Sequence, residues 1–304
     1  MKTSKALIWL SWITAGLALV AAASGLFFQH GGSATAFTTL HGQVVQLYGR
    51  DLYRYDTTLV ALSFKGADLV TLVLAIPLLV ISTLFYQHGR FQGGLLLTGT
   101  LAYFLYNYAS MAFGAAYNAL FLVYVALFSA SLFALVLALT SFDVQEVPAH
   151  FTAGFPRRGV GVFLIVSGGI LALIWLVLSI FPALIGNAVP AEVASYTTFV
   201  TGVVDEGIVA PALLVSGVLL LRCRPVGYLL ASVLLVFTVT LGPNLIAGGV
   251  LQLATGVISI GQALAFSLPF AILTLIAVWL MVVLFRSVSK SATWRLPAMH
   301  QAQA

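Results

Sequence analysis

Long apolar runs follow one another along almost the whole chain, and they limit the fold more than any other feature. A helix needs about 20 mostly apolar residues to cross the roughly 30 Å hydrocarbon core of a bilayer. Only 7% of the residues are charged, against about 25% in soluble domains. The sequence therefore predicts an all-α polytopic membrane protein with about eight transmembrane helices. They span approximately residues 6–28, 67–86, 94–115, 120–140, 159–184, 207–221, 226–247 and 264–285.

Composition excludes several functional classes. The single cysteine, Cys223, allows no internal disulfide, no CxxC redox centre and no cysteine-rich metal site. A formal charge of +5 spread over 304 residues does not form a nucleic-acid surface. No histidine lies in the middle of a span, and HExxH and P-loop motifs are absent. We therefore expect no catalytic residues, no metal and no cofactor, and an enzyme is the less favoured class.

The positions of lysine and arginine predict the orientation, because short cytoplasmic loops retain an excess of them. With the N-terminus inside, ten of the thirteen basic residues fall on the cytoplasmic side. The prediction is a multi-pass protein of the plasma membrane with both termini cytoplasmic. The first five residues and the alanine-rich end of the first run also resemble a secretory signal peptide. That run continues to Phe28, beyond a typical signal core, so an uncleaved anchor is favoured.

The spans divide into two groups of four. We expect a first membrane half at 1–140, which includes an outer loop at 29–66, then a cytoplasmic linker at 141–158, a second half at 159–286, and a disordered cytoplasmic tail at 287–304. A weak internal similarity relates the halves, because Asp68 and Asn107 are spaced like Asp205 and Asn244. The interpretation is a pair of parallel repeats, and the alternative is chance similarity between apolar segments.

The outer loop is the longest hydrophilic segment. Residues 38–48, which are rich in β-branched residues and alternate at 44–48, and a second short run at 52–55 flank a turn at 49–51, which predicts a small β-hairpin. We interpret five of its residues as a lid or as a contact for a protein partner: Arg50, Asp51, Arg54, Tyr55 and Asp56. The alternative is a solvated loop whose ion pairs contribute about 0 to 1 kcal/mol.

Acidic residues close to the membrane are the strongest pointer to function, because an ionisable group facing lipid is costly. The candidates are Asp68, Asp205 and Glu206 at the outer ends of two spans. The alternative for each acid is a helix cap. Polar residues farther into the spans complete the predicted ligand-binding set: Tyr103, Tyr106, Asn107 and Asn244.

These features predict a protein that binds or transports a small solute through a polar cavity open to the outside. An alternative is a non-transporting subunit or sensor whose outer loop binds a protein partner. A lipid-modifying enzyme that uses Asp205 and Glu206 as acid and base is the least favoured interpretation. The expected partners are membrane lipids, a small-molecule solute and a protein at the outer loop, and no nucleic acid.

Overall fold

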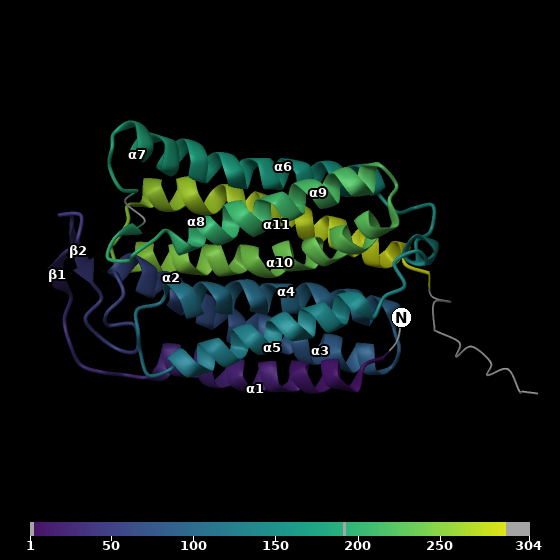
Figure 1. Ribbon diagram of the computed structural model, residues 1–304, viewed down its shortest axis with the longest axis horizontal. Helices are drawn as coiled ribbons and strands as arrows, with labels where there is room; N and C mark the ends of the chain where they lie inside the picture. Colours follow the sequence, from purple (N-terminus) through teal and green to yellow (C-terminus); the bar gives the residue numbers. More distant parts are fainter. Residues whose placement is uncertain (1–2, 191–192, 290–304) are drawn as a thin grey trace, which may run out of the picture.

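The computed structural model describes residues 3–190 and 193–289, which form one bundle of long helices lying side by side (Figure 1). The segments η1, η3 and η5 are π-helical turns, and η2 is a 3-10 turn. In chain order the elements are α1 (Lys5–Phe27), β1 (Thr35–Thr38), β2 (Val44–Leu47), α2 (Thr58–Val70), η1 (Thr71–Ala75), α3 (Ile76–Gln87), α4 (Phe91–Gly114), α5 (Phe121–Thr140), η2 (Val147–His150), α6 (Arg157–Trp175), η3 (Leu176–Ile180), α7 (Phe181–Ile185), α8 (Val200–Val204), η5 (Asp205–Val209), α9 (Ala210–Leu221), α10 (Pro225–Ala254) and α11 (Ile260–Ser287).

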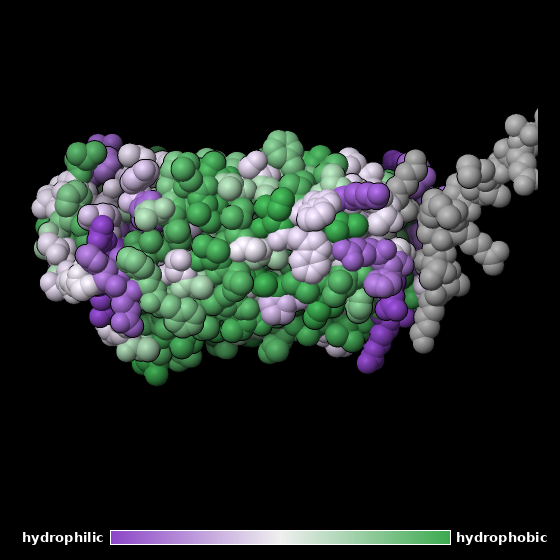
Figure 2. All heavy atoms as spheres, turned by 90° about the horizontal axis from the view of Figure 1, so that it is seen from below, coloured by the Kyte–Doolittle hydropathy of each residue, from purple (hydrophilic) through white to green (hydrophobic). Residues whose placement is uncertain are grey.

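The surface has the pattern of a membrane protein. Figure 2 shows a broad hydrophobic band along the bundle, with hydrophilic residues gathered at its two ends. Within the described residues, seven helices are long and apolar enough to cross a membrane: Lys5–Phe27, Thr58–Gln87, Phe121–Thr140, Arg157–Ile185, Val200–Leu221, Pro225–Ala254 and Ile260–Ser287. Large apolar side chains such as Leu178 and Leu275 lie on the outside of these helices. The chain is therefore an integral, multi-pass membrane protein.

One expected crossing, α4, is not among these seven helices. It runs between the same two ends as its neighbours (Figure 1), and most of its residues are buried against α3, α5 and α10. Its sequence contains Thr98, Thr100, Asn107 and several tyrosines, which lower its hydropathy. A helix enclosed by other helices does not need an apolar surface all round. The sequence predicted eight crossings, and apolar character alone identifies seven.

Helix α10 joins the two parts of the bundle. It packs against α9 and α11 on one side and against α2 and α4 on the other. Glycines permit these contacts, since a Cβ at Gly66 of α2 would lie 2.4 Å from the Gly248 backbone nitrogen of α10. A Cβ at Gly99 of α4 would likewise lie 2.4 Å from the Val236 Cβ. Small residues at such crossings let helix backbones approach closely.

Three of the long helices contain a five-residue π segment, and a proline follows two residues after each of them. The prolines are Pro77 after η1, Pro182 after η3 and Pro211 after η5. Proline has no N–H, and its ring clashes with the carbonyl four residues earlier. A widened π turn relieves that clash without ending the helix.

The outer loop contains a β-hairpin, but the predicted strand pairing was wrong. Strand β2 pairs antiparallel with β1, which precedes it, with Phe37 opposite Val45. Residues 52–55, predicted as the second strand, instead form a turn that bonds back to the end of β2, where the Tyr48 N–H donates to the Asp56 carbonyl. The hairpin lies at one end of the bundle, called here the hairpin end; the opposite end, where α1 begins, is called the N-terminal end (Figure 1).

The linker and the tail lie at the N-terminal end. The linker contains η2, and its Thr152 N–H donates to the Ser287 carbonyl at the end of α11. Residues 290–304 of the predicted tail lie outside the described residues.

Candidate functional site

Asp68 is a buried carboxylate within the third turn of α2. This helix begins after Thr57, whose side chain accepts the Val60 N–H as the N-cap. The Tyr53 hydroxyl donates to Asp68 Oδ2 at 2.7 Å. Asp68 Oδ1 is also buried and has no hydrogen-bond partner among the described residues. Asp68 is therefore too far into α2 to cap its N-terminus, and its described hydrogen bond is with the outer loop.

Glycine on the neighbouring helix makes room for this carboxylate. A Cβ at Gly25 of α1 would lie 1.8 Å from Asp68 Oδ2 and 2.8 Å from the Tyr53 hydroxyl. Even an alanine at this position would overlap both groups. The backbone of α1 therefore closes one side of the Asp68 site.

Tyrosines surround the rest of Asp68. Tyr103, Tyr108 and Tyr124 are all buried within electrostatic range of its carboxylate. The Tyr103 hydroxyl is 3.1 Å from Thr71 Oγ1, and the Tyr108 hydroxyl has no hydrogen-bond partner among the described residues. Hydroxyl groups both donate and accept hydrogen bonds. The tyrosine hydroxyls can therefore serve either a protonated or a charged carboxylate.

Asp205 forms a second buried site. It is the first residue of η5, and its two oxygens accept from two different helices. Tyr106 of α4 donates its hydroxyl to Oδ1 at 3.0 Å, and Trp175 of α6 donates Nε1 to Oδ2 at 2.8 Å. The Trp175 ring stands edge-on to Phe199, with centroids 4.8 Å apart. Neighbouring Glu206 is partly exposed, although its Oε1 is occluded and has no described hydrogen bond.

Helix α4 connects the two acids. Tyr103 and Tyr106 are three residues apart and so share a face of the helix. Tyr103 lies within electrostatic range of Asp68, and Tyr106 bonds to Asp205 and also interacts with Tyr103. Asn107 is buried beside them, with its Nδ2 lacking a described partner.

The fourth polar wall residue that the sequence predicted lies elsewhere. Asn244 is buried in α10, directly after Pro243. No hydrogen bond joins it to Asp68 or Asp205 among the described residues. The structure therefore brings Tyr103 and Tyr106 to the acids, with Asn107 next to Tyr106 on α4, and does not connect Asn244 to them.

The charged residues of the outer loop pair within the loop and with the start of α2. Lys65 forms an ion pair with Asp51 at 2.5 Å. The Arg50 guanidinium lies over the Tyr48 ring at 4.8 Å. Arg54 lies over the exposed Tyr55 ring at 4.9 Å. These cations are thus engaged locally, and none forms a described ion pair with Asp68 or Asp205.

Asp56 makes a different connection, between three separate segments. Its buried Oδ1 accepts the Ala116 N–H from the α4–α5 turn at 2.8 Å and the Tyr196 hydroxyl from the segment before α8 at 2.9 Å. Burial raises the pKa of this carboxyl to about 7, although both hydrogen bonds oppose the shift. We refer to Asp56, Ala116 and Tyr196 as the Asp56 clasp. It ties the outer loop to both parts of the bundle.

Two surface pockets lie away from the acids. One of about 350 Å³ at the hairpin end is lined by Tyr48, Arg50 and Val257, among others, and one of about 450 Å³ lies at the N-terminal end. Neither is lined by Asp68, Asp205 or Glu206. Neither pocket therefore provides a cavity at these acids for an enzyme substrate or for a solute. Within residues 3–190 and 193–289, no three His, Cys, Asp or Glu side chains group as a metal site would require.

Several residues of this site were missed in the sequence. Tyr53 was assigned to a strand, yet its hydroxyl holds Asp68. Trp175 was not among the predicted site residues, yet it donates to Asp205. Tyr108 and Tyr124 also line the cluster. Tyr108 directly follows the predicted residues Tyr106 and Asn107 in the sequence. It was therefore the easiest of these residues to predict.

No family model matches this chain, and no curated protein or solved structure matches it either. A function for this chain is therefore inferred from the geometry of its buried carboxylates.

Proposed function

We propose that this membrane protein binds a small solute at its buried carboxylates and carries it across the membrane. Asp68 and Asp205 are the charged contacts, and the solute is cationic or hydroxyl-bearing. The observation that carries the proposal is the Asp68 carboxylate, buried among tyrosines with one oxygen that accepts no hydrogen bond within the described chain. Burying a carboxylate in this way costs free energy, and acids retained inside membrane spans commonly serve transport or proton transfer.

The arrangement of the two parts of the chain supports a pair of parallel repeats. Three pairs of elements begin 134 residues apart: η1 and η5, α3 and α9, and α4 and α10. The intervening turns also correspond, since Gly89 and Cys223 both have positive φ at this spacing. This alignment pairs Thr71 with Asp205, in place of the pairing of Asp68 with Asp205 that the sequence suggested. Each repeat then places a polar group at the start of its π segment, facing a tyrosine of α4.

In this proposal α4 is the eighth crossing, and residues 1–140 and 159–286 are the two halves. The N-terminal end carries Lys5, Arg90, Arg157, Arg158, Arg222, Arg224 and Arg286. Such an excess favours a cytoplasmic position for this end, with both termini inside the cell and the hairpin end outside. The plasma membrane follows as the proposed location.

Solute access requires the outer loop to move, because the Tyr53 hydroxyl and the α1 backbone enclose Asp68. The Asp56 clasp joins this loop to Ala116 and Tyr196. In this proposal the clasp holds the outer loop closed over the site, and its release opens the site to the outside.

Native mass spectrometry of the protein purified in mild detergent tests the proposal without a guess about the ligand. The comparison is wild type against Asp68→Asn and Asp205→Asn, with Glu146→Gln as a matched control because Glu146 is exposed in the linker. We expect a small co-purifying mass in wild type and control that is lost in either aspartate variant. Identical spectra for all four proteins would contradict a solute site at these carboxylates.

The outer hairpin gives one reason to retain a second candidate function, a subunit or sensor that binds a protein partner. Leu40 at the hairpin tip is 96% exposed, and Phe37 and Val44 beside it are also exposed. Exposed apolar side chains gathered at a loop tip are typical of contact surfaces. Replacing residues 37–44 with a Gly and Ser linker would abolish partner capture while leaving the co-purifying mass unchanged.

A further inference from the structure

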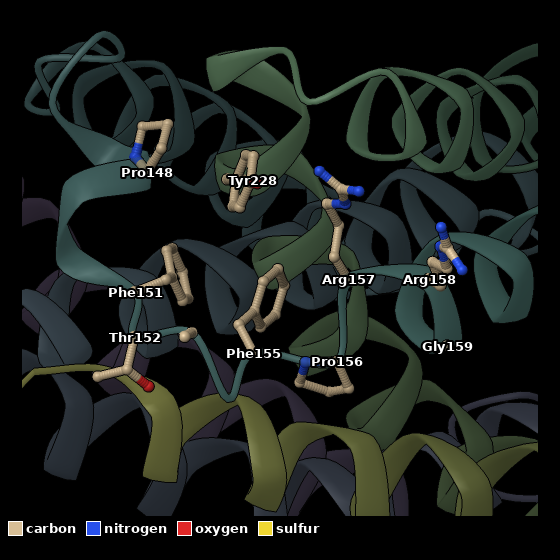
Figure 3. Close-up of a pocket in the computed structure, with 10 residues that line it drawn as sticks. Pro148, Phe151, Thr152, Phe155, Pro156, Arg157, Arg158, Gly159 and Tyr228 are labelled. Atoms are coloured by element: carbon tan, nitrogen blue, oxygen red, sulfur yellow. The ribbon is translucent and has the colours of Figure 1, made fainter.

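A pocket at the N-terminal end lies apart from the buried carboxylates. It has a volume of about 450 Å³ and lies between the linker, the start of α6 and the first turn of α10. Figure 3 shows its aromatic rings on one side and its two arginines on the other. The residues that line it are Pro148, Phe151, Thr152, Ala153, Phe155, Pro156, Arg157, Arg158, Gly159 and Tyr228.

Three aromatic rings form one wall of this pocket. The ring centroids of Phe151 and Phe155 are 4.7 Å apart. The Tyr228 centroid lies 5.7 Å from that of Phe151 and 5.6 Å from that of Phe155. The backbone that carries Phe151 is anchored to the end of α11 through the Thr152 bond to Ser287 and the Ser289 bond to His150. The aromatic wall is therefore built on ordered backbone.

Two arginines line the pocket beside this wall. Arg157 and Arg158 are the first two residues of α6, and neither forms an ion pair with an acid in the described part of the chain. Arg157 contacts the Cys223 sulfur, which turns its side chain toward the α9–α10 turn and its cations Arg222 and Arg224. The pocket thus combines two arginines that form no described ion pair with a wall of three aromatic rings.

The backbone adds further donors. Helix α6 is 19 residues long and begins after Pro156. No side chain caps its N-terminus. Uncapped N–H groups at the start of a helix favour an anion. A guanidinium group can also donate two parallel hydrogen bonds to two oxygens of one phosphate.

We propose that this pocket binds a phosphate group, with Arg157 and Arg158 as the charged contacts and the aromatic wall against the organic part of the ligand. Two sources share this chemistry. One is the headgroup of an anionic membrane phospholipid, since the pocket lies at the end of the bundle that carries most of the arginines. The other is a soluble phosphate compound.

Native mass spectrometry in a non-ionic detergent separates the two sources. One arm adds phosphatidylglycerol, with phosphatidylcholine as the zwitterionic reference, and the other adds inorganic pyrophosphate. The variant is Arg157→Gln with Arg158→Gln, and Arg90→Gln is the matched control because Arg90 lies at the same end of the bundle, on the α3–α4 turn. Thermal unfolding without ligand checks that each variant is folded, and Arg158→Gln alone replaces the double variant if the latter is not.

We expect the double variant to bind at least fivefold less of one ligand while Arg90→Gln binds as much as wild type. Loss confined to phosphatidylglycerol identifies the lipid headgroup, and loss confined to pyrophosphate identifies a soluble ligand. Equal binding of both ligands by wild type and the arginine variants would overturn the proposal. Asp68→Asn leaves these results unchanged, so this site stands or falls separately from the proposed solute site.

Discussion

Replacing Asp56 with asparagine should remove a pH dependence from the stability of the protein. The carboxyl is 1% exposed, and burial raises its pKa from 3.8 to about 7. The folded protein therefore binds this proton more tightly than the unfolded chain does. Its contribution to stability is complete below about pH 4, declines as the pH rises toward 7, and changes no further above that.

The size of this effect follows from the shift of about 3 pKa units. At about 1.4 kcal/mol per unit, the folded state loses about 4 kcal/mol between pH 4 and pH 7. At about 2 °C per kcal/mol for a chain of this length, that is a fall of roughly 8 °C in Tm. Asparagine keeps an oxygen that accepts from Ala116 and Tyr196 and carries no charge, so the variant lacks this component.

Thermal unfolding in detergent at pH 5 and pH 8 measures the part of this effect that lies between pH 5 and the pKa near 7, which is about 3 kcal/mol, or roughly 5 °C in Tm. Other acids also titrate, so the informative quantity is the change in Tm of wild type minus that of Asp56→Asn. The exposed linker variant Glu146→Gln controls for the loss of a carboxylate. If Tm falls equally in wild type and in Asp56→Asn between the two pH values, the Asp56 clasp does not set the pH dependence of stability.

Two further substitutions test the site and the helix packing. Tyr106→Phe removes one of the two donors to Asp205, so we expect thermal unfolding to show a loss of stability of about 1 to 3 kcal/mol. The exposed Tyr55→Phe is the control and should be neutral. Equal stability of the two variants would argue against this hydrogen bond. Gly66→Ala places a Cβ 2.4 Å from Gly248 and should cost about 1 to 3 kcal/mol, while Gly169→Ala, with no atom within 4 Å of its Cβ, should not; an equally stable Gly66→Ala would contradict the close crossing of α2 and α10.

The helical membrane architecture could be predicted because it depends on one-dimensional information. Apolar run length and the positions of charges located the long helices to within a few residues in most cases. The start of the second helix was placed late, at residue 67, whereas α2 begins at Thr58. Thr57 is a good N-cap, and the polar residues Ser63 and Lys65 interrupt the apolar run that follows it.

The pairing within the outer loop was harder to predict. Both 35–38 and 52–55 have residues suited to a strand beside 44–47, and sequence alternation does not choose between them. The turn at 39–43, with Thr39 bonding to the Gln43 N–H, decides the register in favour of β1.

The candidate site could be predicted only in part. Asp68, Asp205 and the α4 tyrosines were identified because membrane composition alone does not account for them. Tyr53 and Trp175 were missed because their contacts with the acids come from residues 15 and 30 positions away. A tyrosine in a loop or a tryptophan in a span has many ordinary roles, and only the packing of the helices selects the one it has.

The most direct test of the account is the stability of Asp68→Asn at pH 8 after prolonged dialysis. If Asp68 serves binding rather than folding, its buried carboxylate is a cost to the empty protein. Asparagine keeps an acceptor for the Tyr53 hydroxyl and removes the charge, so we expect its Tm to rise by at least about 2 °C, corresponding to about 1 kcal/mol. A Tm below that of wild type would mean that Asp68 holds the fold together, and would contradict its assignment as the charged contact of a solute site.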